Sequence, residues 1–214
     1  MKKINKNFYF SVSTLLAFIL WTLAIQLVDV RAIGPHKSTV GFAAINQFFH
    51  KLTGVNMSLY VITDWLGLVP LMFVIGFGIL GLVQWIKRKH ILKVDFNILV
   101  LGGFYIIVML VYILFETVVV NYRPILINGY LEASYPSSTT MLVMCVMPTA
   151  IMQLNTRIKN HIFKKIIIYT ITAFIIFMVI GRLVSGVHWF TDIIGGALLS
   201  IGLVLMYRFI SVLK

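Results

Sequence analysis

Two polar stretches of the sequence carry residue types that could bind and transfer a phosphoryl group. In the first of them, Arg182, His188 and Asp192 form the pattern R-x5-H-x3-D. If a helix begins near His188, its imidazole and the Asp192 carboxylate share one helix face. A carboxylate that accepts the proton of one ring nitrogen leaves the other nitrogen free as a nucleophile or base. By itself, an isolated histidine at the end of a helix is more often a solvated interfacial residue than a catalytic one.

The second stretch, NYRPILINGYLEASYPSST (residues 121–139), supplies groups that could hold a phosphate. Arg123 has a fixed charge and five donors that suit phosphate oxygens. Ser137, Ser138 and Thr139 stand at the start of a long apolar run and are expected to begin a helix. The free N–H groups and the dipole at such a helix start favour an anion. Together the two stretches predict a phosphate site with a histidine nucleophile.

The elements that must position these residues are membrane helices. The 214-residue chain is 60% hydrophobic and 11% charged, with a mean hydropathy of +1.00, a composition typical of integral membrane proteins. A helix needs about 20 apolar residues to cross about 30 Å of hydrocarbon. We therefore predict one all-α domain, residues 1–214, with six transmembrane helices. The apolar runs are Phe8 to Val28, Leu59 to Trp85, Phe96 to Val120, Ser138 to Leu154, Ile166 to Gly181 and Trp189 to Leu213.

A shorter amphipathic segment, residues 41–53, lies between the first and second runs. Phe42, Ile45, Phe49 and Leu52 recur in it at helical spacing. Because it is too short to cross a bilayer, we expect an interfacial helix on the outer leaflet. A lid packed on the bundle is an equally good interpretation.

Basic residues are concentrated in alternate connections, which predicts the orientation because Lys and Arg are retained on the cytoplasmic side. One side holds Lys2, Lys3, Lys6, Lys87, Arg88, Lys89, Lys93, Arg157, Lys159, Lys164, Lys165, Arg208 and Lys214, and the other holds Arg31, Lys37, Lys51, Arg123 and Arg182. Both termini are therefore predicted to be cytoplasmic, in a multi-pass protein of the cell membrane whose candidate site is extracytoplasmic. The net charge of +12 then reflects topology and anionic lipid, and not nucleic-acid binding.

The polar stretches resemble the motifs of the type 2 phosphatidic acid phosphatases, a family that shares its site with vanadium haloperoxidases and bacterial acid phosphatases. The family motifs are K-x6-R-P, P-S-G-H and S-R-x5-H-x3-D. Here they correspond in order to ETVVVNYRP (residues 116–124), PSST (136–139) and GRLVSGVHWFTD (181–192). The resemblance covers the whole predicted six-helix core and implies a membrane lipid phosphatase that requires no cofactor.

The resemblance also implies a role for each matching residue. His188 would be the nucleophile that takes the phosphoryl group, and Asp192 would orient it. Arg123, Arg182, Ser137 and the neighbouring backbone N–H groups would hold the phosphate oxygens.

Four positions depart from the family motifs. Glu116 replaces the lysine, Ser138 and Thr139 replace the glycine and histidine of the second motif, and Gly181 replaces the serine before the arginine. A dianionic phosphate would bind beside Glu116 only if that carboxylate were protonated, paired with an arginine or bound to a cation. Thr139 cannot protonate a leaving oxygen near neutral pH, a function that contributes about 10²- to 10⁴-fold.

Two functions follow as alternatives. The favoured one is a lipid phosphatase or phosphotransferase that acts on a phosphorylated lipid through a phosphohistidine. A lipid diphosphate is the favoured substrate, because its leaving group is already stable as an anion and a divalent cation near Glu116 could bridge its phosphates. Glu132 is a rival source of the missing proton, which would allow monophosphates to react. The alternative function is a catalytically inactive relative that binds a lipid phosphate or supports a membrane complex. The sequence makes no prediction of the oligomeric state.

Overall fold

The computed structural model describes residues 2–212 and the side chains of residues 6–212, so Met1, Leu213 and Lys214 lie outside the description. Within these bounds the chain forms eight α-helices and two 3₁₀ helices, and the predicted all-α class is confirmed. The α-helices are α1 (Lys2–Leu27), α2 (Ala43–Thr53), α3 (Met57–Leu66), α4 (Leu68–Arg88), α5 (Phe96–Thr117), α6 (Ser138–Arg157), α7 (His161–Val184) and α8 (Phe190–Ser211). The 3₁₀ helices are η1 (Pro35–Lys37) and η2 (Ile91–Lys93).

Five segments of the described chain are long and apolar enough to cross a membrane, namely α1, α3 together with α4, α5, α7 and α8. The fourth predicted span, Ser138 to Leu154, corresponds to α6 and falls outside this set. It packs against α4, α5, α7 and α8, and this interior position lets it carry the buried polar residues Thr140, Thr149 and Gln153. A helix surrounded by others needs less apolar surface than one that faces lipid. The six-span topology therefore stays a prediction.

The predicted second span, Leu59 to Trp85, consists of two helices and not one. The break is at Gly67, whose N–H bonds to the carbonyls of Thr63 and Asp64, each at 3.0 Å. Pro70 follows in the first turn of α4 and has no N–H to continue the helical ladder back into α3. The break lets α3 pack against the end of α7.

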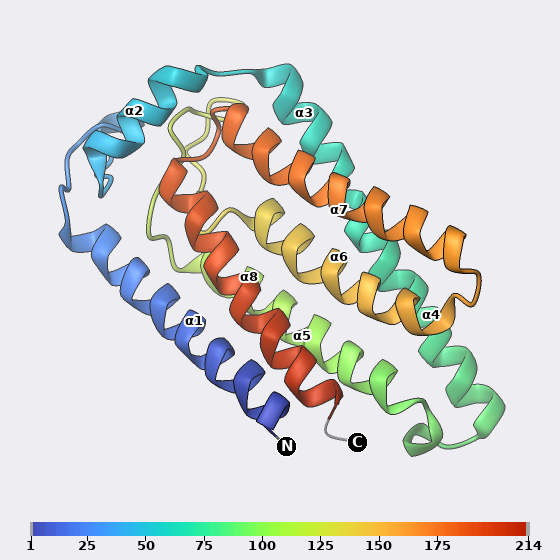
Figure 1. Cartoon of the computed structure of the whole chain (residues 1–214). Coiled ribbons are helices and arrows are strands. Elements are labelled where there is room, and N and C mark those ends of the chain that lie inside the picture. Colours follow the sequence, from blue (N-terminus) through green and yellow to red (C-terminus); the bar gives the residue numbers. More distant parts are fainter. Residues whose placement is uncertain (1, 213–214) are drawn as a thin grey trace.

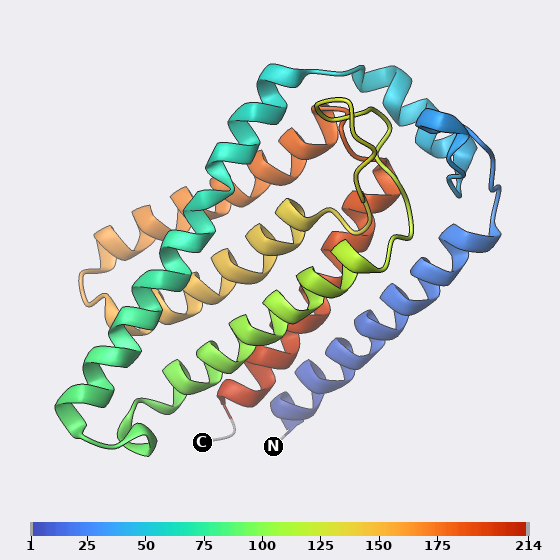
Figure 2. The same ribbon diagram turned by 180° about the vertical axis from the view of Figure 1, so that it is seen from behind.

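The two ends of the helix bundle carry different connections between helices (Figures 1 and 2). Both described chain ends, the α4–α5 connection and the α6–α7 turn lie at one end. The opposite end carries α2, the long connection of residues 118–137 and the turn between α7 and α8. The basic connections are thus gathered at the end that the sequence assigns to the cytoplasm. Their orientation in the membrane stays a prediction.

The predicted short helix between the first two spans is confirmed as α2. It packs on the start of α8, where the rings of Phe49 and Phe190 stack with centroids 4.1 Å apart. Asn46 is buried and fastens this contact, because its Nδ2 donates to Thr191 Oγ1 at 3.0 Å and its Oδ1 accepts from the Thr191 N–H at 3.2 Å. Phe48 and Leu52 remain exposed. The helix therefore covers the bundle as a lid would, and it keeps an apolar outer side that suits a lipid interface.

Candidate functional site

The candidate site lies at the end of the bundle opposite the termini, where α7 ends and α6 and α8 begin (Figure 1). Five of the residues singled out in the sequence are buried there, at most 8% exposed: Arg123, Ser137, Arg182, His188 and Asp192. They come from the connection of residues 118–137, from α7, and from the turn into α8. The contacts described below join them into one polar cluster.

His188 is held from both sides of its ring. Nε2 lies 3.1 Å from an Arg182 terminal nitrogen, and because a guanidinium can only donate, Nε2 is the acceptor of this bond. The ring proton is therefore on Nδ1, which lies 3.1 Å from the Ser134 carbonyl oxygen and 3.0 Å from the Ser134 hydroxyl. This tautomer leaves the Nε2 lone pair directed toward the arginines.

Burial and the charges of the two arginines determine the protonation state of His188. Desolvation, then the positive charges of Arg123 and Arg182, hold the pKa of the imidazole well below its ordinary value of 6.5, against the opposing effect of the hydrogen bond to the Ser134 backbone. His188 is consequently neutral at neutral pH. A neutral imidazole is the form that can act as a nucleophile.

Asp192 contacts His188 indirectly, which differs from the direct pairing expected from the sequence. The closest approach, between His188 Nδ1 and Asp192 Oδ2, is 3.9 Å, longer than a hydrogen bond. The hydroxyl of Ser134 fills the gap and donates to Asp192 Oδ2 at 2.5 Å. Asp192 also accepts from the N–H of Trp189 at 2.9 Å and from Asn121 Nδ2 at 3.4 Å. The carboxylate therefore positions the ring through Ser134 and through the backbone at the start of α8.

Each arginine of the cluster is paired with a carboxylate. Arg123 Nε lies 3.1 Å from Glu132 Oε2, and a terminal nitrogen of Arg182 lies 3.7 Å from Asp64 Oδ1. Both carboxylates are partly exposed, whereas the guanidiniums are buried. A phosphate that reached the arginines could therefore displace or rearrange these carboxylates toward solvent.

Several buried donors in this cluster make no hydrogen bond. Within the described residues, these are one terminal nitrogen of Arg123, Nε of Arg182, and the hydroxyls of Ser137 and Thr140. Nε of Arg123 is close to Glu132 but also makes no hydrogen bond of suitable geometry. Buried polar groups are normally satisfied, and those that are not mark sites for a ligand, a water or an ion. Donors of this kind, on two cations and a helix start, would suit an anion with several oxygens.

The start of α6 offers fewer backbone donors than the sequence suggested. Ser137 is its N-cap residue, but the Ser137 N–H is already bonded to the Asp192 carbonyl at 3.1 Å. Only its hydroxyl remains available. The N–H groups of Ser138, Thr139 and Thr140 open the helix and have no acceptor within it by helix geometry.

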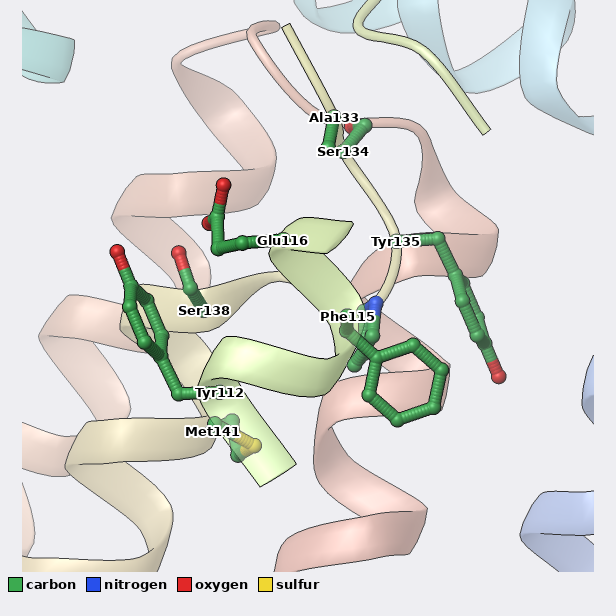
Figure 3. Close-up of a pocket in the computed structure, with 9 residues that line it drawn as sticks. Tyr112, Phe115, Glu116, Ala133, Ser134, Tyr135, Ser138 and Met141 are labelled. Atoms are coloured by element: carbon green, nitrogen blue, oxygen red, sulfur yellow. The ribbon is translucent and has the colours of Figure 1, made fainter. Parts of the chain in front are cut away.

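Glu116 lies at the end of α5 and is exposed. It lines a small pocket together with Tyr112, Ser134 and Ser138 (Figure 3). This places the carboxylate beside the cluster, as expected of a residue at the border of the site. Across the described residues, no group of three or more His, Cys, Asp or Glu side chains is arranged to hold a metal ion. A divalent cation at Glu116 stays a prediction, and it would need oxygens from the substrate.

Comparisons with known proteins relate the part of the chain that carries the cluster to one family. The PAP2 superfamily matches residues 117–213. The fold is similar to the crystal structure of a transmembrane PAP2 type phosphatidylglycerolphosphate phosphatase from Bacillus subtilis, with a TM-score of 0.59, 21% sequence identity and coverage of 94% of each chain. No curated protein matches the chain at a significant level. The chain thus has several helices that could span a membrane and the fold of a transmembrane PAP2 protein, and its residues 117–213 match the PAP2 superfamily.

One departure from the PAP2 motifs has a structural explanation. A side chain at Gly181, where the motif has serine, would place its Cβ 2.8 Å from Thr63 Cγ2 on α3. Contacts this short require a neighbour to move. Glycine at this position therefore accommodates the close approach of α3 to α7.

A second departure, Thr139, faces a cavity of about 420 Å³ between α4, α5 and α6. Its walls are largely apolar, with Leu71 and Val108 among them, and Asp64 and Ser138 also line it. Thr139 therefore has open space beside it. The position that carries the general acid in the PAP2 motif is accessible here but has no titratable group.

Sequence reasoning did not identify Ser134, Asn121, Asp64 and Tyr60 as site residues. Asn121 lies within the first motif stretch and Ser134 lies two residues before the second, so their proximity to the motif residues was a usable signal. Asp64 and Tyr60 are on α3, more than fifty residues before the first motif and outside the matched region. No local pattern connects them to the site.

Proposed function

We propose that the protein is a lipid phosphatase or phosphotransferase that acts at the extracytoplasmic face of the cell membrane through a phosphohistidine at His188. The family and the membrane fold support this class of activity. The observation that carries the proposal is the neutral His188, whose Nε2 faces Arg182 at 3.1 Å within a cluster of buried donors that make no hydrogen bond.

The chemical step follows from this geometry. A bound phosphate takes the hydrogen bonds of Arg182 and Arg123, which frees the Nε2 lone pair of His188. Nε2 then attacks phosphorus, and the bond from phosphorus to the leaving oxygen breaks with its electron pair on that oxygen. The imidazolium that forms is stabilised because Nδ1–H donates to Ser134, which in turn donates to Asp192.

The second step regenerates the histidine. Water, or a hydroxyl of an acceptor molecule, attacks the phosphohistidine, the phosphorus–nitrogen bond breaks, and its electron pair returns to Nε2. The proton of the attacking hydroxyl goes to solvent. The two arginines bind the phosphate oxygens through both steps, and electrostatic stabilisation of this kind is usually the largest contribution to catalysis.

The leaving group favours a lipid diphosphate as substrate. A lipid monophosphate expels an alkoxide, which must be protonated, and Thr139 cannot supply that proton. A diphosphate expels a phosphate monoester, which is stable as an anion. Glu132, partly exposed and paired with Arg123, is the rival acid for a monophosphate.

Phosphate release from a panel of lipid mono- and diphosphates tests the proposal with purified protein. The wild type is expected to release phosphate and to accumulate acid-labile labelled phosphohistidine after a brief incubation with substrate. His188→Ala should lose both signals, and His161→Ala, at the start of α7, is the matched control that should keep them. A wild type that binds lipid phosphate but never becomes labelled or releases phosphate would instead identify a binding protein.

A further inference from the structure

Helix α3 packs closely against the end of α7 that carries the candidate site. The N–H of Asn56 donates to the carbonyl of Ser185 at 3.0 Å. Gly186 has a positive φ of +69°, and a Cβ there would lie 1.9 Å from the carbonyl oxygen of Gly54. The segment that leads into α3 is therefore in backbone contact with the turn between Arg182 and His188. Only the α3 side of this contact lies outside the region that matches the PAP2 superfamily.

One face of α3 is directed at Arg182. The ring centroid of Tyr60 lies 5.0 Å from the guanidinium carbon, Thr63 Oγ1 lies 3.5 Å from a terminal nitrogen, and Asp64 Oδ1 lies 3.7 Å from the same nitrogen. Residues three and four apart share a helix face, so the three contacts come from one orientation of α3. Arg182 is thus held by α3 as well as by its own helix.

The ring of Tyr60 also reaches the second arginine. Its centroid lies 5.9 Å from the guanidinium carbon of Arg123. Both distances are within the range in which the negative face of an aromatic ring attracts a cation. Two buried cations repel each other strongly in a medium of low dielectric constant, and an aromatic ring attracts both of them without adding a charge that a phosphate would have to displace.

We propose that Tyr60 is a positioning residue of the phosphate site, which holds the guanidiniums of Arg123 and Arg182 in place for a phosphate. The inference rests on the proposed function, because it assumes that these arginines bind phosphate. Glu116 stands where the motif has a lysine, so the site has one cation fewer than the motif. With two cations in place of three, the affinity for phosphate depends more strongly on where each cation is held.

The ring of Tyr60, and not its hydroxyl, carries this role. Tyr60→Phe keeps both ring–guanidinium contacts, whereas Tyr60→Leu and Tyr60→Met remove the ring and keep an apolar side chain. Tyr169→Leu is the matched control, since Tyr169 is an exposed tyrosine of α7. Two variants without the ring are included so that the comparison can still be made if one of them does not fold.

Equilibrium binding of inorganic phosphate to the purified full-length proteins tests the inference, with the thermal unfolding midpoint of each variant measured without phosphate. We expect Tyr60→Phe and Tyr169→Leu to bind phosphate like the wild type. Both ring-free variants should bind it about tenfold more weakly, whether or not their unfolding midpoints change.

Three results would overturn the inference, and they are distinguishable. Ring-free variants that bind phosphate like the wild type would show that Tyr60 only packs. Tyr60→Phe as weak as Tyr60→Leu would assign the effect to the hydroxyl. Absence of phosphate binding by the wild type itself would reject the phosphate site, and with it the proposed function on which the inference rests.

Discussion

His188 Nδ1 and Asp192 Oδ2 are 3.9 Å apart, too far for a direct hydrogen bond, and the side chain of Ser134 bridges them. The Ser134 hydroxyl lies 3.0 Å from His188 Nδ1 and donates to Asp192 Oδ2 at 2.5 Å. A hydrogen-bonded relay of this kind fixes the tautomer of the ring and stabilises the positive charge that the ring gains on attack.

Ser134→Ala should therefore lower kcat without abolishing activity. The variant removes a hydrogen bond to a charged group, worth about 1.5–3 kcal/mol, which corresponds to a decrease of about 10- to 100-fold. The Ser134 carbonyl still accepts from Nδ1, so the loss should be smaller than that of Asp192→Asn. Steady-state kinetics of the two variants, with the exposed Ser58→Ala as control, measure the difference. A Ser134→Ala enzyme with unchanged kcat would contradict the relay.

The residues of the polar cluster on the 118–137 connection and at the helix ends could be grouped from the sequence, because they follow one another at fixed spacings. Arg123, Ser137, Arg182 and His188 all lie buried in this cluster, and their functional roles stay predictions. The insertion of Ser134 between histidine and aspartate was not predictable. It depends on how the 118–137 connection folds over the start of α8, and helix periodicity carries no information about that.

The helix positions were also largely predictable, whereas the break between α3 and α4 was not. Hydropathy reads Leu59 to Trp85 as one continuous run, and only the hydrogen bonds around Gly67 reveal two helices. For the same reason the proximity of Tyr60 to the two arginines could not be predicted from the sequence. It requires the close packing of α3 on α7, a tertiary contact between residues far apart in the chain.

That packing makes a prediction about Gly181. Restoring the family serine with Gly181→Ser should destabilise the protein, because the new Cβ would lie 2.8 Å from Thr63 Cγ2, and overpacking costs about 1–3 kcal/mol. Thr63→Ser removes that methyl group and keeps the hydroxyl that contacts Arg182. Thermal unfolding in detergent should show a lowered midpoint for Gly181→Ser and recovery in the double variant.

The control for this comparison is Gly103→Ser, since a Cβ at Gly103 would have no described neighbour within 4 Å. It should unfold like the wild type. If Gly181→Ser were equally harmless, or if Thr63→Ser gave no recovery, the close packing of α3 on α7 would not be the reason for the glycine.

The depressed pKa of His188 predicts that stability falls in mild acid. The unfolded histidine titrates at about pH 6.5, whereas the folded one titrates at a lower pH. The unfolded state therefore binds more protons below pH 6.5. The free energy of unfolding is therefore unaffected by this titration above about pH 6.5. It decreases as the pH falls below about 6.5, by at most about 1.4 kcal/mol per pH unit.

The effect of His188 can be measured from the thermal unfolding midpoints of the wild type and of His188→Gln. The measurements run from about pH 7.5 to about pH 5, on both sides of the ordinary histidine pKa. The wild type should lose more stability than the variant. Burial also lowers the pKa of His50, but His50 is present in both proteins and its effect cancels. Parallel pH profiles for the two proteins would mean that His188 is not held neutral by the fold.

The orientation of the bundle can be tested by cysteine labelling in intact cells. The single native cysteine, Cys145, is buried and should not react. A membrane-impermeant maleimide should label Tyr130→Cys, on an exposed side chain of the site end, and should label Lys89→Cys or Lys159→Cys only after permeabilisation. Ser185 is unsuitable as an outer probe because it is buried. Labelling of Lys89→Cys from outside would reverse the predicted topology and move the site to the cytoplasmic face.

The absence of an acid at Thr139 leads to a prediction about substrate choice. The wild type should hydrolyse a polyprenyl or similar lipid diphosphate faster than the corresponding monophosphate. If a divalent cation at Glu116 assists, chelator should lower the diphosphate rate. Thr139→His restores the titratable group of the family motif and has room for a ring, because Thr139 lines the 420 Å³ cavity. The variant should gain selectively on monophosphates, by tenfold or more, since general acids contribute about 10²- to 10⁴-fold.

Hydrolysis rates distinguish Glu132 from a group at position 139 as the source of the proton. They are measured on lipid monophosphates and diphosphates for the wild type, Thr139→His, Thr139→Val and Glu132→Gln. Thr139→Val is the matched control and should behave like the wild type, because neither side chain can donate a proton to an alkoxide near neutral pH. If Glu132 were the acid instead, the wild type would already cleave monophosphates, Glu132→Gln would lose that activity selectively, and Thr139→His would add little. In either case the diphosphate rate should be the less affected, because its leaving group departs as a stable anion and needs no proton.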